Sequence, residues 1–140
     1  MNITIHYIGE LKESYFREAA AEYEKRLTAF CRLKNAEAGS DAGILDSLKG
    51  RSYKIALCVE GGMLSSEEFA ALIARGADRG GANIDFVIGG AEGLSEKVKA
   101  ACDCRLSLSK MTFPHRIARI LLLEQLYRAF TINNVMKYHK

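Results

Sequence analysis

The sequence lacks the features that mark several specialised protein classes. It contains no tryptophan and one proline, and no apolar run approaches the roughly 20 residues that a membrane span requires. Its four cysteines, Cys31, Cys58, Cys102 and Cys104, include no C-x-x-C pair of the kind that holds tetrahedral zinc. The first residues do not follow the basic and then apolar order of a secretory signal peptide. We therefore expect a cytoplasmic protein with reduced thiols, no membrane segment and no bound metal.

What is present is the composition of an ordinary globular protein. The 140 residues are 49% hydrophobic and 26% charged, and a chain of this length buries enough surface to fold without disulfides. We expect residues 1–140 to form a single domain.

The charge is unevenly divided along the chain. From Arg105 to Lys140 there are seven basic residues and one acidic residue, whereas the first 104 residues have 13 basic and 16 acidic ones. A basic C-terminal quarter favours contact with a polyanion such as a nucleic acid, and a solvated helix face explains it equally well.

Apolar periodicity predicts strands and helices in alternation. Strands are expected at 2–8, 31–38, 55–59, 84–88 and 105–109, the second being weak. Helices are expected at 14–30, 65–79, 95–101 and 114–132, with one or two helical turns at 44–49. Ser65 and Glu68 have the spacing of a capping box, and Pro114 suits a first helical turn. This order predicts an α/β fold with a mainly parallel sheet.

Three glycine-containing or polar loops are expected where buried strands end. They are residues 60–62, 89–93 and 110–113, at the sheet edge where open parallel sheets bind their ligands. A further loop is expected at 39–43. The pattern favours a small-molecule pocket of nucleotide size. The chain has neither a dinucleotide fingerprint after its first strand nor a phosphate-binding G-x-x-x-x-G-K-[ST] loop, which disfavours a dinucleotide-dependent reductase.

Four motifs, in the same order along the chain, carry a family resemblance. They are Ile88–Leu94 (IGGAEGL), Leu106–His115 (LSLSKMTFPH), Glu124–Ala129 (EQLYRA) and Tyr138–Lys140 (YHK). Together they closely resemble the RNA large subunit methyltransferase H family, and the resemblance extends over nearly the whole chain. Two departures are visible: the segment between Ala36 and Ser52 is shorter than in the family, and Cys58 stands where relatives carry an acid.

The resemblance implies a SPOUT-class fold with a C-terminal trefoil knot. It also implies methyl transfer from S-adenosylmethionine to N3 of a pseudouridine in 23S rRNA of the ribosome, by a homodimer in which one subunit's tail completes the other's pocket. A non-catalytic module that binds a nucleotide and RNA, or a structural ribosome-associated protein, remains an alternative on the sequence alone.

The resemblance assigns one set of residues to the cofactor, and charge and acid–base chemistry suggest an RNA-binding set and a catalytic set. The cofactor set is Leu57, Gly89, Leu108, Ser109, Lys110, Met111, Thr112 and Phe113. The RNA-binding set is Lys110, His115, Arg116, Arg119, Lys137 and Lys140. Arg128, Tyr138 and His139 are candidate catalytic residues, because the N3 imide must lose a proton and needs either a base or a group that stabilises the anion.

Overall fold

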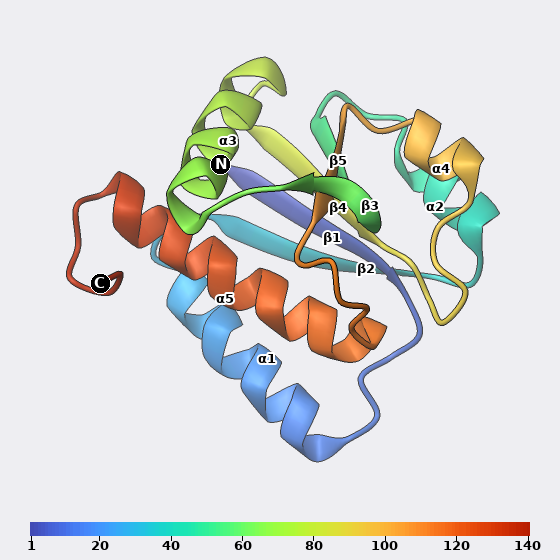
Figure 1. Cartoon of the computed structure of the whole chain (residues 1–140), viewed down its shortest axis with the longest axis horizontal. Coiled ribbons are helices and arrows are strands. Elements are labelled where there is room, and N and C mark those ends of the chain that lie inside the picture. The colour runs from blue at the N-terminus through green and yellow to red at the C-terminus, as the bar shows by residue number, and fades with distance from the viewer.

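The computed structural model describes residues 1–140, in which five strands alternate with five helices (Figure 1). The strands are β1 (Asn2–Ile8), β2 (Arg32–Ala38), β3 (Tyr53–Met63), β4 (Asn83–Ile88) and β5 (Cys104–Ser107). The helices are α1 (Ser14–Leu27), α2 (Asp41–Ser47), α3 (Ser66–Arg79), α4 (Glu96–Ala100) and α5 (His115–Asn133). None of these helices combines the length and the apolar character needed to cross a bilayer.

The strands form one sheet in the order β2-β1-β4-β3-β5. All four neighbouring pairs are parallel, so their carboxyl ends meet at the same edge. Ile84 of β4 aligns with Ile3 of β1 and with Tyr53 of β3, which places β4 at the centre of the sheet. The predicted α/β class with a mainly parallel sheet is confirmed, and the trefoil knot stays a prediction.

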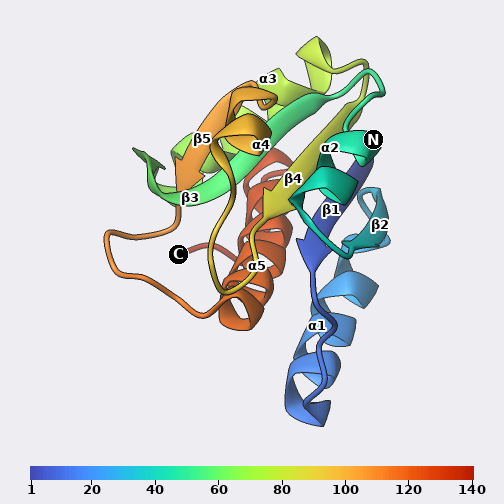
Figure 2. The same ribbon diagram turned by 90° about the vertical axis from the view of Figure 1, so that its right-hand side faces the viewer.

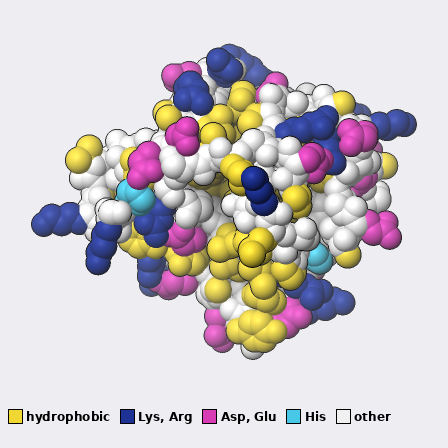
Figure 3. Space-filling view, in the orientation of Figure 1, with side chains coloured by type: hydrophobic (Ala, Val, Ile, Leu, Met, Phe, Trp, Pro, Cys, Tyr) yellow, Lys and Arg dark blue, Asp and Glu magenta, His cyan; other side chains and the backbone are white.

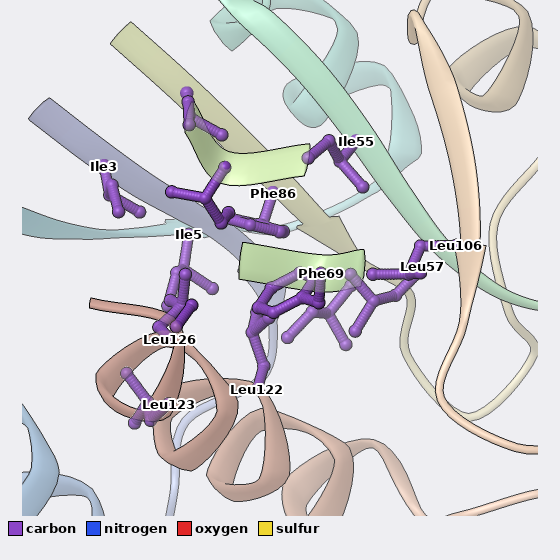
Figure 4. Close-up of a cluster of buried hydrophobic side chains, with 14 of the residues drawn as sticks. Ile3, Ile5, Ile55, Leu57, Phe69, Phe86, Leu106, Leu122, Leu123 and Leu126 are labelled. Atoms are coloured by element: carbon purple, nitrogen blue, oxygen red, sulfur yellow. The ribbon is translucent and has the colours of Figure 1, made fainter. Parts of the chain in front are cut away.

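The helices cover the two faces of the sheet unequally. α3 and α5 lie on one face with α1 packed against α5, and α2 and α4 lie together on the other, as Figure 2 shows. Apolar side chains of the sheet point toward α3 and α5, where Phe86 meets Phe69, and Leu122, Leu123 and Leu126 close the layer (Figure 4). Burying each such side chain stabilises the fold by about 1.5–3 kcal/mol.

Side-chain caps begin the helices α3 and α4, which start at the carboxyl edge of the sheet. Ser65 accepts a hydrogen bond from the Glu68 backbone N–H while the Glu68 carboxylate accepts one from the Ser65 N–H, which confirms the predicted capping box. Ser95 caps α4 in the same way by accepting from the Val98 N–H, at 3.3 Å.

The prediction of a loop at 60–62 was wrong, because β3 continues through these residues to Met63. Leu57 and Gly62 both align with Leu106 of β5, so the residues between them bulge out of the ladder. Gly61 lies so close to β5 that a Cβ atom there would be 2.7 Å from the Leu106 backbone. Gly61 and Gly62, which were predicted to form a loop, therefore lie where β3 contacts β5.

The loop predicted at 39–43 was also wrong, since α2 begins at Asp41. The Ser40 hydroxyl accepts from the Gly43 N–H at 3.3 Å, and Ile44 is fully buried against the sheet. The Ser40 cap and the buried Ile44 side chain are enough to stabilise the two turns of α2, although Gly43 within it has a low helix propensity. Smaller differences are that α1 ends at Leu27 rather than residue 30, and β5 ends at Ser107 rather than residue 109.

Replacing Gly61 by alanine is expected to destabilise the protein by about 1–3 kcal/mol, because the new methyl group would overlap the β5 backbone. Gly39→Ala is the matched control, since nothing lies within 4 Å of a Cβ there. Urea denaturation followed by circular dichroism measures both variants. Equal midpoints for the two would contradict the close approach of β3 and β5.

Candidate functional site

A cavity of ≈ 660 Å³ lies at the carboxyl ends of β3, β4 and β5. This volume falls within the range of roughly 300–1,000 Å³ that is usual for small-molecule sites. All of the residues predicted to bind the cofactor line it except Lys110, whose side chain is exposed. The predicted cofactor residues thus lie together at one cavity, and their role in binding stays a prediction.

The β4–α4 loop forms one wall of the cavity and is tightly closed. The Gly93 N–H donates to the Gly90 carbonyl at 3.0 Å, and Gly93 has a positive φ of 76°. A Cβ atom on Gly89 would lie 2.5 Å from the carbonyl carbon of Gly93. Only glycine at residue 89 allows the loop to fold back this closely on the end of β4.

The segment that joins β5 to α5 forms the opposite wall. The Ser107 hydroxyl donates to the Ser109 carbonyl at 2.7 Å, and the Ser109 hydroxyl accepts from the Met111 N–H at 3.0 Å. These two bonds hold the loop without regular secondary structure. The half-buried Leu108 packs against the core, and with Leu57 it gives the cavity apolar surface.

A charged pair that the sequence did not assign to the site also lines the cavity. Lys99 of α4 donates to Glu60 of β3, and its ammonium lies 3.5 Å from Glu96. The hydrogen bond from Lys99 lowers the pKa of Glu60 below its ordinary value. No sequence signal indicated Lys99, because its approach depends on how α4 crosses the end of β3.

His115 and Arg116 begin α5 beside the cavity. His115 lines it, and burial together with the adjacent Arg116 charge lowers the pKa of His115 below its ordinary value. Arg116 donates to Glu13 at 3.1 Å, which ties the start of α5 to the start of α1.

Arg119 has a different environment from the rest of the predicted RNA-binding set. It is 6% exposed, and its guanidinium lies 3.9 Å from the ring centroid of Tyr7. Its Nε and Nη1 atoms have no hydrogen-bond partner. Contact with a phosphate would require this side chain to leave its place on Tyr7, whereas Lys110, Lys137 and Lys140 are exposed.

The candidate catalytic residues lie together in a network around Glu124. Arg128 donates to Glu124 Oε2 through Nε at 3.1 Å and Nη2 at 2.9 Å, and the Tyr138 hydroxyl donates to the same oxygen at 3.0 Å. Arg128 Nη1 lies 3.0 Å from His139 Nδ1, and His139 Nε2 contacts Glu67. Burial and the hydrogen bond to Glu124 raise the pKa of Tyr138 to about 12.

This network does not reach the cavity of its own chain. The cavity-lining residues include His115 and Ala118 but nothing later in the chain. Glu124 follows His115 by nine residues, which is about 13 Å along the axis and half a turn around it. In Figure 1 the C-terminus lies at the left end of α5 and the loops that line the cavity lie to the right.

Comparison with known proteins identifies the family. A family model described as "Predicted SPOUT methyltransferase" matches residues 1–139. This chain belongs to the SPOUT methyltransferase family. Members use S-adenosylmethionine as the methyl donor, which confirms the cofactor that the resemblance implies. The cavity fits such a donor, because it offers apolar walls and closely packed backbone at one edge of the sheet.

Individual relatives agree with this assignment. Ribosomal RNA large subunit methyltransferase H from Clostridium acetobutylicum is 43% identical over 159 aligned positions that cover 100% of both chains. A probable methylase family protein from Haemophilus influenzae has a TM-score of 0.63 at 18% identity, over 99% of this chain and 70% of that one. The SpoU methyltransferase AviRb from Streptomyces viridochromogenes, solved in complex with AdoMet, has a TM-score of 0.50 at 10% identity, over 91% and 57%. The two structures support the fold.

The pKa of His115 is expected to lie below the ordinary histidine value, because of burial and of the positive charge on Arg116. Removing the neighbouring positive charge with Arg116→Gln should raise the pKa of His115, whereas Lys110→Gln should leave it unchanged. Proton NMR titration of the three histidines, with His115 assigned from a His115→Gln sample, measures this pKa. A value for His115 above the ordinary one would contradict the buried, positively charged setting.

Proposed function

We propose that this protein transfers a methyl group from S-adenosylmethionine to N3 of a pseudouridine in 23S rRNA. The observation that carries the proposal is the full-length likeness to ribosomal RNA large subunit methyltransferase H, together with a cavity built from the residues that this likeness assigns to the cofactor. The reaction forms a bond between N3 and the methyl carbon, breaks the sulfur–methyl bond, and releases the N3 proton.

The cavity residues have a positioning role in this proposal. Bound S-adenosylmethionine supplies a methyl group activated by the positive sulfur, so the protein's main task is alignment. Leu57 and Leu108 would pack against the adenine, and the backbone around Gly89 and residues 109–113 would supply hydrogen bonds. Lys99 and Glu60 add a charged wall to the same cavity, for the polar end of the donor.

The tail residues would act on the target base. Arg128 can only donate hydrogen bonds, so its contact with His139 makes Nδ1 the acceptor and places the ring proton on Nε2. Arg128 and Tyr138 are donors suited to stabilising the negative charge that develops on N3. His139 becomes available as a base through Nδ1 when the substrate takes over the donor at Arg128 Nη1, while Nε and Nη2 stay on Glu124.

A homodimer would join the tail of one subunit to the cavity of the other. Two observations support this arrangement: the tail network lies half a turn and about 13 Å along α5 from His115, and apolar side chains including Met63, Leu64, Ile117 and Met136 are exposed. Figure 3 shows apolar side chains gathered over the starts of α5 and α1. A second copy would cover such surface and bring its tail to the cavity.

Lys110, His115, Arg116, Lys137 and Lys140 would contact the rRNA around the target. Basic side chains project around the C-terminal end of the molecule, on the left of Figure 3. Phosphate contacts from such residues would make binding to the ribosome weaken with salt.

Transfer of tritium from labelled S-adenosylmethionine to ribosomes tests the function directly. Ribosomes from a strain that lacks the enzyme should accept about one methyl group each on a 23S rRNA pseudouridine, because only that site would be aligned with the donor. Ribosomes from the parent strain, already methylated, are the control. Nuclease mapping and nucleoside mass spectrometry locate the label. Donor binding without transfer to either sample would overturn the proposal.

Subunit mixing tests the shared site. Gly89→Val should lose donor binding because its side chain overlaps Gly93, and a chain truncated after Lys137 should bind the donor normally but not turn over. Each variant alone should be inactive. After subunit exchange the mixture should recover about a quarter of wild-type activity, since half of the dimers are mixed and each mixed dimer has one complete site.

Melting curves check that both variants are folded before they are mixed, and calorimetry checks that the truncated chain binds the donor whereas Gly89→Val does not. Exchange is verified with differently tagged subunits. No recovery after verified exchange would show that the tail does not complete a partner's cavity.

A further inference from the structure

Glu124 is the common partner of the tail network and has no role in any of the residue sets above. Its Oε2 accepts three hydrogen bonds, two from Arg128 and one from Tyr138, at 2.9–3.1 Å. Its Oε1 accepts from the Gln125 amide at 2.7 Å, and Gln125 in turn accepts from the Ser66 hydroxyl at 2.8 Å. The carboxylate is 17% exposed and is anchored to α3 through this second route.

A helix salt bridge alone does not account for this arrangement. Glu124 and Arg128 are four residues apart, and such a pair contributes about 0.3–0.5 kcal/mol to a helix. Tyr138, however, comes from beyond the end of α5, fourteen positions after Glu124. Its hydroxyl has no other hydrogen-bond partner, so Glu124 is the residue that fixes where this hydroxyl lies.

The same carboxylate sets the direction of Arg128 and, through it, of His139. Two guanidinium nitrogens bind Glu124, which leaves Nη1 directed at His139 Nδ1 at 3.0 Å. Two of the planar donors are held by one acceptor, so the third has a defined direction. The guanidinium also lies 4.8 Å from the ring centroid of Tyr138, whose edge packs on Tyr127 at 4.7 Å.

We propose that Glu124 is a positioning residue that holds Arg128, Tyr138 and His139 in the one geometry from which they serve methyl transfer. This inference rests on the proposed function, because it takes these three side chains as the groups that act on the target base. Glu124 acts through them, because its carboxylate is taken up by Arg128, Tyr138 and Gln125 and it does not line the cavity of its own chain.

Glu124→Gln tests the proposal, because it keeps the size of the side chain and removes its charge. We expect kcat for methyl transfer to fall by roughly 100-fold, as misplacement of reacting groups by about 1 Å does in other enzymes. The affinity for S-adenosylmethionine, measured by calorimetry, should not change. Asp46→Asn is the control, since it breaks the exposed Asp46–Lys49 pair, which lies on the other side of the sheet from α5 and outside the network. It should retain full activity.

Two further measurements separate positioning from a structural contribution. In samples labelled with carbon-13 at the tyrosine ring, the Tyr138 resonance, assigned from Tyr138→Phe, should titrate at lower pH in Glu124→Gln. Loss of the hydrogen-bond acceptor and of the nearby negative charge makes the phenolate easier to form. The double variant Glu124→Gln/Tyr138→Phe should lose less activity than the product of the two single losses, because both act through one unit.

Failure of the proposed role of Glu124 can be distinguished from failure of the proposed methyl-transfer function. No methyl transfer by the wild-type protein would overturn the function, and the tyrosine titration would still report whether Glu124 controls the tail. Wild-type activity retained by Glu124→Gln, or losses that multiply independently, would overturn the role of Glu124. If the glutamine variant melts below the assay temperature, Glu124→Asp keeps the charge but shortens the reach, and the same kcat loss with normal donor affinity is expected.

Discussion

The parallel pairing of β3 with β4 on one side and with β5 on the other determines where the rest of the protein can act. Because these three strands run in one direction, their ends deliver Leu57, Gly89 and Leu108 to the same edge of the sheet. The approach of β3 to β5 depends on the absence of a side chain at Gly61. A bulge in β3 then carries Glu60 outward to meet Lys99. Cavity and charged wall are both consequences of this one set of strand contacts.

Sequence patterns predicted the fold well wherever local chemistry and burial agree. The unbroken apolar run around Leu57 and the mainly apolar run around Phe86 are typical of buried strands, and the spacing of Ser65 and Glu68 indicated where α3 begins. The errors at Gly39–Gly43 and Glu60–Gly62 have a shared cause. In both places glycine was interpreted as part of a loop. In the structure, Gly61 allows the β5 backbone to approach closely, and the Gly43 N–H binds the Ser40 cap of α2. Such approaches depend on tertiary contacts that a single sequence does not display.

The residues of the candidate site also fall into a group that the sequence predicted and a group that it did not. Residues that follow strands were predictable, because the ends of parallel strands must lie together. Lys99, which reaches the cavity from α4, and Glu124, which gathers the tail, were not, since each depends on how a helix is placed. Arg119 illustrates the opposite error of pattern reasoning. Its spacing from Arg116 favours a shared basic face on the surface. In the structure, however, the Arg119 side chain is buried against the ring of Tyr7.

The position of Glu124 on α5 restricts how the length of this helix can vary. One residue inserted or deleted between His115 and Glu124 would rotate everything after it by about 100° and shift it by about 1.5 Å. The tail network would then turn away from its present side of α5 and lose its contacts with Ser66 and Glu67 at the start of α3. A change of about seven residues, close to two full turns, would nearly restore the direction, but it would move the network by about 10 Å. Helix α5 thus has a fixed length, and natural length variation is expected in connections such as the segment between β2 and β3, which contains α2, rather than within α5.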